Sequence, residues 1–460
     1  DVLVSAKIPA SAYEKVETAY AEKLLRYKDI IEVEYTANYI SSDSAVKVLR
    51  DKSGIFFVHY MVEPKRLSIE QYEDRFYTTL ELNGMISDAG GNMVYQFRKK
   101  LPVEFKKEQI DKIKTKLFSF QDMFPLVEGT YSLHILLKNN VSKEFTSFEK
   151  NITVPLDTSL QMSSLILANR IRTNTKYGDK TKPFLVNNIQ LVPSPRNDFS
   201  RSDTLYLFFQ VYGLDQSLIN NGSLRYTLYR EGEVAHSFSK NVKDYQEAPD
   251  FLERIDLSLY PPAYYKIQVS LFDDHNNELL SEQENFLISH YVSLPRPWIL
   301  SEVFPSSKDP VYSNILGNQL LNQKQISKSI ILLEDAYQRN HNSLKFGLDY
   351  ARALFLSHKY RKAKEVLEPF SKKENQSPEL LALLGSACQK LEQHEEAIAY
   401  FKQYLSRFGT NLKILNAIGQ NYLLLGKPKE ALVALEKSLE LNPEQEEIKE
   451  LVELIKKKKQ

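Results

Sequence analysis

The stretches LGSACQKLEQHEEAIAYF (residues 384–401) and IGQNYLLLGKPKEALVAL (residues 418–435) show most clearly a pattern that recurs every 34 residues. This pattern decides the fold of the C-terminal third of the chain. One phase of the pattern holds the small residues Gly317, Ala351, Gly385 and Gly419. Twelve positions later stand Ser329, Ala363, Ala397 and Ala431, and four positions after these stand Leu333, Leu367, Phe401 and Leu435. In an apolar period of about 3.6 residues, a fixed small residue predicts that two helices approach closely, and the large residue fills the gap beside it.

The period, the small-residue phases and the closing Leu441-Asn442-Pro443 resemble the tetratricopeptide repeat, a stacked helix–turn–helix unit. The resemblance implies a solenoid of four units over residues 310–460. One further amphipathic helix is expected from Glu444 to Lys457. Because the last unit of a stack would otherwise expose its apolar face, we expect this helix to cap the array.

Ahead of the repeats the apolar period changes to 2, which is typical of β-strands. Residues 55–62 read IFFVHYMV, and SDAGGN (residues 87–92) suits a hairpin turn. Two blocks then share one order of features, which is a turn, a tyrosine (Tyr131 or Tyr265), an alternating strand and an Asn/Asp-rich turn. A tyrosine in this place resembles the tyrosine corner of immunoglobulin-like and fibronectin-like sandwiches, whose hydroxyl bonds back to the upstream backbone.

The predicted architecture is therefore two antiparallel β-sandwiches followed by an α-solenoid. Its parts are a helical lead-in (1–29), a first sandwich (30–155), a second sandwich (156–291), a proline-rich elbow (292–309) and the repeats (310–460). Pro295 and Pro297 stiffen the elbow, because proline fixes its own backbone and removes a donor. We expect Trp298 to wedge between the second sandwich and the first repeat.

Composition narrows the function classes. With 60 basic against 59 acidic residues, the chain lacks the bulk positive charge of a nucleic-acid or anionic-membrane surface. No apolar run approaches the ~20 residues that span a bilayer, so no membrane insertion is expected. The chain opens on Asp1, which a processed mature form and an excised segment explain equally well. The single cysteine, Cys388, fits a small buried hydrophobe, and such sparse use of cysteine suits an exported bacterial protein.

No motif for catalysis, a metal or a cofactor stands out. The eight histidines are scattered, with none at ligand spacing. The acidic stretch from Asp273 to Glu278 lacks the alternating ligands and glycine of an EF-hand loop and suits a polar hairpin tip. Gly426-Lys427 runs into Pro428 and lacks the upstream glycine of a phosphate loop. We therefore expect no enzyme and no cofactor.

The groove of the solenoid is the candidate binding site. In the repeat family the first helix of each unit lines a concave surface. Polar residues at two neighbouring positions of these helices form the candidate partner-binding set: Asn314, Asn318, Arg352, Ser386, Asn416 and Gln420. A ladder of amides with one arginine can hydrogen-bond an extended peptide, although the same residues also suit solvated helix faces. The third-repeat cations of repeat proteins that clamp a terminal carboxylate are missing, since Ala382 and Ser386 stand there.

Tandem β blocks, a proline-rich spacer and repeats together resemble the C-terminal half of exported bacterial GWxTD-domain and von Willebrand factor A-related proteins. The Gly-Trp-x-Thr-Asp signature itself is absent. The leading hypothesis is a non-enzymatic scaffold of the bacterial envelope or exterior, with the sandwiches as spacers or adhesive modules and the groove docking a protein or peptide. The alternative is an accessory region of a larger exported enzyme that binds glycan, for which exposed aromatics among Tyr206, Phe208, Tyr226 and Tyr229 would argue. A cytosolic co-chaperone is the third hypothesis.

Overall fold

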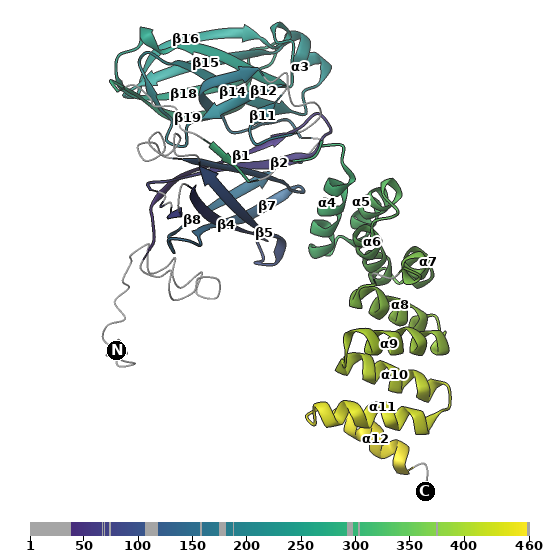
Figure 1. Ribbon diagram of the computed structural model, residues 1–460. Helices are drawn as coiled ribbons and strands as arrows, with labels where there is room; N and C mark the ends of the chain where they lie inside the picture. Colours follow the sequence, from purple (N-terminus) through teal and green to yellow (C-terminus); the bar gives the residue numbers. More distant parts are fainter. Residues whose placement is uncertain are drawn as a thin grey trace, which may run out of the picture. The chain divides into compact units, whose positions relative to one another are not determined.

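The chain divides into two compact units, Asp1–Lys308 and Asp309–Gln460. Figure 1 shows the computed structural model, a β-rich first unit and a helical second unit. The structure describes residues 38–66, 68, 70–72, 75–105, 118–156, 159–173, 181–186, 188–291, 298–301, 304–373 and 376–457. The predicted helical lead-in over residues 1–29 lies outside these ranges.

The first sandwich consists of two sheets. One sheet has the order β1 (Ser42–Arg50), β2 (Phe56–Pro64), β6 (Ser119–Pro125) and β20 (Trp298–Leu300). The other has the order β3 (Glu70–Tyr72), β4 (Arg75–Asp88), β7 (Gly129–Asn139) and β8 (Phe145–Val154), with β5 (Met93–Phe105) also paired to β4. Alternate residues of β2, Val58, Tyr60 and Val62, point into the core between the sheets, as the period of 2 predicts.

The second sandwich repeats this plan. One sheet has the order β11 (Leu185–Val186), β12 (Ile189–Pro193), β10 (Ile166–Thr173), β14 (Thr204–Tyr212) and β17 (Asp250–Asp256), with β9 (Gln161–Met162) on β14. The facing sheet has the order β13 (Asp198–Ser200), β19 (Glu278–Ser289), β18 (Ala263–Phe272), β15 (Ser223–Arg230) and β16 (Glu233–Asn241). Short helical segments connect some of its strands, among them α3 (Gln216–Asn221), η3 (Val242–Asp244) and η4 (Leu257–Leu259).

Both predicted tyrosine corners are confirmed. The Tyr131 hydroxyl donates to the carbonyl oxygens of Val127 at 3.1 Å and Glu128 at 2.8 Å. The Tyr265 hydroxyl donates to the carbonyl oxygen of Pro261 at 2.8 Å. Each ring is buried, so the phenol needs such a partner, and the bond ties a strand to the loop that precedes it.

A third apolar cluster joins the two sandwiches. Its buried members come from β1 and β2 on one side and from the second sandwich on the other: Leu49, Met61, Ile166, Ala168, Phe184, Leu191 and Phe208. Next to it the backbone N–H of Phe184 donates to Nδ1 of the buried His59 at 2.9 Å. The Gln210 side chain bonds both backbone polar groups of Arg50, each at 2.7 Å. The sandwiches therefore form one body, which the tandem arrangement predicted from sequence did not include.

The predicted elbow over residues 292–309 needs a correction. Its residues Trp298–Leu300 form β20, which pairs in parallel with β6 of the first sandwich. The hydroxyl of the buried Ser301 donates to Asp122, and Phe304 is buried and bridges to Thr181. The strand forms because β6 would otherwise be a sheet edge with unpaired backbone groups. Trp298 thus belongs to the first sandwich through its backbone, so that only residues 305–309 remain between the anchored Phe304 and the first repeat.

The helical unit contains four helix pairs. They are α4 (Pro310–Asn322) with α5 (Ile326–Arg339), α6 (Leu344–Leu356) with α7 (Tyr360–Ser371), α8 (Pro378–Lys390) with α9 (His394–Phe408), and α10 (Leu412–Leu424) with α11 (Pro428–Leu441). The first helix of each pair starts at a side chain that caps its free N–H groups, and the caps are Asp309, Ser343, Ser377 and Asn411. In the described part of the chain, no helix is both long and apolar enough to cross a membrane.

The small-residue phases mark the close helix contacts that the sequence predicts. A methyl group added to Gly385 would lie 2.4 Å from the Phe401 ring, and one added to Gly419 would lie 2.5 Å from Leu435. In the first pair the Ser329 hydroxyl donates to the carbonyl oxygen of Gly317 at 2.8 Å. The expected capping helix is α12 (Glu446–Lys457), whose Ile448, Val452 and Ile455 cover Leu432 and Leu435 of α11.

Candidate functional site

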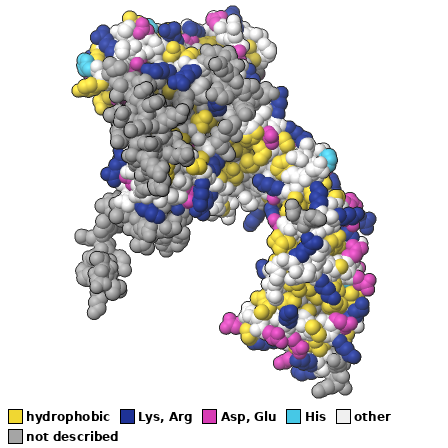
Figure 2. Space-filling view, in the orientation of Figure 1, with side chains coloured by type: hydrophobic (Ala, Val, Ile, Leu, Met, Phe, Trp, Pro, Cys, Tyr) yellow, Lys and Arg dark blue, Asp and Glu magenta, His cyan; other side chains and the backbone are white. Residues whose placement is uncertain are grey.

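The first helices of the pairs, α4, α6, α8 and α10, form the predicted binding face. Neighbouring first helices contact each other, α4 with α6 and α6 with α8. In a curved stack the helices on the inner side lie closest together, so these contacts fit the concave side. Figure 2 shows one face of the molecule, on which basic, acidic and apolar side chains of the repeats are interspersed.

The two sets of helices differ in charge. The first helices carry six charged residues in all: Lys345, Asp349, Arg352, Glu379, Lys390 and Lys413. The second helices carry eighteen, with four in α5, five in α7, four in α9 and five in α11. Depletion of charge is typical of the central part of a protein interface, because a buried charge loses its hydration. The face of the first helices is therefore the better suited of the two to contact a protein.

The structure brings three of the predicted residues together around Asp349. The side-chain amides of Asn314 and Asn318 donate to Asp349 Oδ2 at 2.9 and 3.0 Å, and Arg352 donates to Asp349 Oδ1 at 3.1 Å. Asn314 is buried, with 1% of its surface exposed. The amides of the first repeat therefore satisfy a carboxylate of the second repeat, and Asn314 is not available to a peptide.

Arg352 extends this polar contact to the third repeat. Its guanidinium donates to Glu379 of α8 as well as to Asp349. Burial would lower the pKa of Arg352, but the two carboxylates outweigh it and raise the pKa above its ordinary value. The guanidinium thus stays charged, and its side chain remains 39% exposed. A chain of hydrogen bonds, Asn314 and Asn318 to Asp349, then Arg352, then Glu379, links three successive first helices.

The other three predicted residues lie apart from this cluster. The Ser386 hydroxyl bonds its own helix, at the carbonyl oxygen of Ala382, over 2.8 Å. Asn416 donates to Gln445, the residue before the capping helix, at 2.8 Å. Gln420 is exposed on α10. Of the six predicted residues, Arg352, Ser386 and Gln420 are therefore the ones whose side chains are best placed for an outside partner.

Asp349, Glu379 and Gln445 were missed by the sequence reasoning, although each binds a predicted residue. Asp349 could have been found, because it lies among the buried apolar residues of α6 and a buried carboxylate needs donors. Nothing in the sequence singles out Glu379 and Gln445 in the same way, since both residues lie near the start of a helix and suit a solvent-exposed position as well.

Cys388, the single cysteine, lies buried in an apolar cluster of the repeats. Burial raises the pKa of the Cys388 thiol to about 11, because it outweighs the opposing effect of the Lys364 ammonium, and the Glu396 carboxylate adds to the rise. The thiol therefore stays protonated and weakly nucleophilic. Within the described ranges, no group of three histidine, cysteine or acidic side chains lies close enough to hold a metal ion.

The aromatic residues that would support glycan binding do not form an exposed platform. Phe208 and Tyr226 are buried in apolar clusters, and Tyr206 packs on the cluster between the sandwiches. The Tyr229 ring is partly covered by the ammonium of Lys266, 4.5 Å from its centroid. These four side chains therefore serve packing, which removes the observation that would have favoured glycan binding.

Comparison with known proteins agrees with the repeat assignment. The family described as anaphase-promoting complex, cyclosome, subunit 3 matches residues 322–404, and the tetratricopeptide repeat family matches residues 376–444. No curated protein matches the sequence.

Solved structures of MamA resemble part of the chain. One crystal structure of MamA is 18% identical, covers 31% of this chain and 84% of that chain, and has a TM-score of 0.30. MamA from Desulfovibrio magneticus RS-1 is 14% identical, covers 33% of this chain and 86% of that chain, and has a TM-score of 0.32. The helical unit of this protein is, by its helix pairs and its two family matches, a tetratricopeptide repeat array that follows a β-sheet unit.

Proposed function

We propose that this protein is a non-enzymatic scaffold that docks an extended segment of a partner protein on the face of its first helices. Repeat arrays of this kind bind proteins, and this one offers a charge-poor face beside a strongly charged one. The contrast in charge between first and second helices is the observation that carries the proposal. Arg352, Ser386 and Gln420 would supply hydrogen bonds to the partner's backbone.

The hydrogen-bonded chain through Asp349 has a role in this proposal. It fixes α4, α6 and α8 relative to one another and holds their polar side chains in place. Little side-chain entropy is therefore lost when a partner binds. Exposed Leu356 and Leu424, at the ends of α6 and α10, would supply apolar contacts at one edge of the face.

The β unit would serve as a rigid base or adhesive module. Its two sandwiches share an apolar cluster, and β20 ties the chain that leads to the repeats into the first sandwich. We place the protein in the periplasm or outside a bacterial cell, on the resemblance to exported bacterial proteins and on the sparse use of cysteine. Cell fractionation with an antibody tests the compartment, and a signal confined to the cytoplasm would contradict it.

The docking proposal is tested by site-specific photo-crosslinking of the full chain. One copy carries the crosslinker at Gln420 on α10, and a matched copy carries it at Glu365, an exposed position of the second helix α7. We expect one protein to be captured from Gln420 and not from Glu365.

The affinity of that captured protein is then measured against the triple variant Arg352→Ala, Ser386→Ala, Gln420→Ala. Loss of three side-chain contacts should weaken binding at least tenfold. Hydrogen exchange of α6, α8 and α10 serves as the folding control. Unchanged affinity in a folded triple variant, or equal capture from both crosslinker positions, would refute docking on this face.

A further inference from the structure

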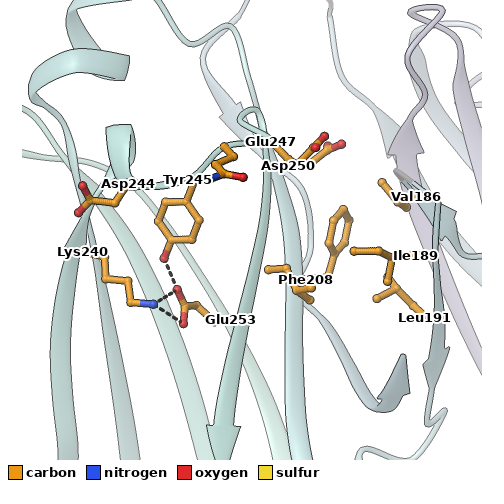
Figure 3. Close-up of a pocket in the computed structure, with 12 residues that line it drawn as sticks. Val186, Ile189, Leu191, Phe208, Lys240, Asp244, Tyr245, Glu247, Asp250 and Glu253 are labelled. Carbon is orange, nitrogen blue, oxygen red and sulfur yellow. Dashed lines mark hydrogen bonds and ion pairs between the residues drawn. The ribbon is translucent and has the colours of Figure 1, made fainter. Parts of the chain in front are cut away.

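A cleft of about 510 Å³ opens in the second sandwich (Figure 3). One wall is apolar and comes from four strands, with Val186 of β11, Ile189 and Leu191 of β12, Phe208 of β14 and Leu252 of β17. The opposite side is polar and includes Lys240 of β16, Asp244 of η3 and the start of β17. Sites for small organic molecules have volumes of about 300 to 1,000 Å³ and combine apolar walls with a few polar groups.

The apolar wall follows from the alternation of the strands. Phe208 and Leu252 are directly paired across β14 and β17, while their neighbours Phe209 and Phe251 point into the core of the sandwich. Phe208 and Leu252 therefore lie on the outer face of the sheet, where they join the cluster between the two sandwiches. The apolar wall of the cleft is therefore outer sheet surface next to this cluster, and the packed core behind the sheet holds it in place.

The polar side is fixed by a hydrogen-bond network. The ammonium of Lys240 donates to the two carboxylate oxygens of the buried Glu253 at 2.7 and 3.0 Å, and the Tyr245 hydroxyl donates to the same carboxylate. The hydroxyls of Tyr226 and Tyr245 lie 2.7 Å apart. Glu253 thus neutralises Lys240, and this network holds the Tyr245 ring against the cleft before any ligand arrives.

Three further carboxylates line the cleft between η3 and β17. Asp250 accepts a hydrogen bond from Gln210 at 2.6 Å, and Glu247 lies 3.8 Å from the ammonium of Lys52. Asp244 and Glu247 are exposed. Because exposed ion pairs contribute little, Glu247 can exchange Lys52 for a ligand cation at small cost. Of the side chains lining the cleft, four are carboxylates and one is an ammonium.

We propose that this cleft binds a small amphiphilic cation, with an alkyl or aryl body against Ile189, Phe208 and Leu252 and a protonated amine at Asp244 and Glu247. The excess of carboxylates favours a cation and repels a carboxylate or phosphate group. The aliphatic wall suits a body without hydroxyl groups, because a sugar would leave its hydroxyls without partners there. This binding is separate from the docking of a protein on the repeats.

Three probes with the same body and different heads test the proposal on the full chain: 4-phenylbutylamine, 4-phenylbutan-1-ol and 4-phenylbutyrate. Calorimetry or ligand-observed NMR at pH 7 and 50 mM salt should give binding in the order amine, alcohol, carboxylate. Raising the salt to 500 mM should weaken the amine about threefold to tenfold and leave the alcohol unchanged, because salt screens the charges at the exposed rim.

The double variant Asp244→Asn, Glu247→Gln should weaken the amine fivefold to tenfold and leave the alcohol unchanged. Since both side chains are exposed, folding should not depend on them. The matched control, Asp274→Asn with Glu278→Gln at the exposed end of the β18–β19 hairpin, should bind the amine like the unaltered chain. Leu252→Ala should weaken the amine and the alcohol alike. Equal binding of the amine and the carboxylate, an unchanged amine affinity in the double variant, or no binding of the amine at millimolar concentration would each overturn the proposal.

Discussion

The β unit and the repeat array are held together over different distances along the chain. In the array the side-chain bonds between repeats join near neighbours, such as Asn314 with Asp349, 35 residues apart. In the β unit Ser301 bonds Asp122, 179 residues away, and Lys47 bonds Glu284, 237 residues away. The array is therefore a sum of neighbouring contacts, whereas the β unit must close long loops before its contacts form. The effect of a substitution should therefore stay local in the repeat array and spread to distant strands in the β unit.

The largest effect is expected at Asp122, the buried carboxylate that holds distant strands of the β unit. It accepts hydrogen bonds from Tyr60 at 2.6 Å, from Lys99 at 2.9 Å and from Ser301. Asp122→Ala should lower the free energy of unfolding by about 3 to 5 kcal/mol, because buried donors lose their acceptor. Urea unfolding measures this loss. Hydrogen exchange of the native variant should show reduced protection in β20 and β6 together.

The isosteric Asp122→Asn is the matched control, since its carbonyl oxygen keeps the hydrogen bonds of two donors. We expect it to lose less stability than Asp122→Ala. Full protection of β20 in Asp122→Ala would show that Asp122 does not anchor this strand, and the contrast in contact range would then fail for this part of the β unit.

The next effect is expected at Gly385 in the array, where α8 and α9 approach. The side chain of Gly385→Val would meet the Phe401 ring, which lies 2.4 Å from the position of an added methyl group. Overpacking of this kind costs about 2 to 3 kcal/mol. Hydrogen exchange should show the loss in α8 and α9, with the β unit unaffected.

Lys390→Val is the matched control, because it adds a β-branched residue at an exposed position of the same helix. It should cost less than about 1 kcal/mol through helix propensity alone. Reduced protection of the β strands in Gly385→Val would contradict the locality of the array.

A smaller effect depends on pH and is expected between the two sandwiches. Burial lowers the pKa of His59 from 6.5 to about 3, so the folded protein keeps this ring neutral. Below pH 6.5 the unfolded chain binds a proton that the folded chain does not bind, and stability falls by about 1.4 kcal/mol per pH unit until about pH 3. At pH 5 the loss from His59 should be about 2 kcal/mol.

The measurement is the difference in unfolding free energy between the unaltered chain and His59→Asn, from pH 7 to pH 5. Asparagine keeps an acceptor for the Phe184 N–H but has no titratable ring. The variant should be less stable at pH 7 and should lose about 2 kcal/mol less on acidification. Parallel pH profiles for the two chains would show that His59 does not respond to pH in this way.

The smallest effect is expected at the tyrosine corners. Tyr131→Phe and Tyr265→Phe each remove a hydrogen bond to an upstream carbonyl oxygen and should each cost about 1 kcal/mol. Tyr264→Phe is the control, because Tyr264 neighbours Tyr265 but is 76% exposed, and it should cost nothing measurable. If Tyr264→Phe lowered the free energy of unfolding as much as Tyr265→Phe, the hydrogen bond of the tyrosine corner would not be the source of the stability.

Sequence reasoning succeeded where the signal is local and repeated. The two small-residue phases of the repeats predicted the contacts at Gly385 and Gly419, and the shared position of Tyr131 and Tyr265 predicted both corner bonds. The candidate binding face stays a prediction, and the hydrogen-bond partners of its residues were not predicted. Asn314 and Asn318 occupy positions typical of a peptide-binding ladder, yet Asp349 of the next repeat uses their donors.

The sequence by itself determined the repeat period, the capping helix and the alternation of the strands, because each depends on residues that are neighbours along the chain or recur at a fixed spacing. Only the tertiary structure decided that β20 returns to the first sandwich, that the sandwiches share an apolar cluster, and that a cleft stays open beside it. These features join segments far apart in the sequence. They are stabilised by the burial of apolar surfaces whose residues have no regular spacing along the chain. No pattern in the sequence therefore predicts them.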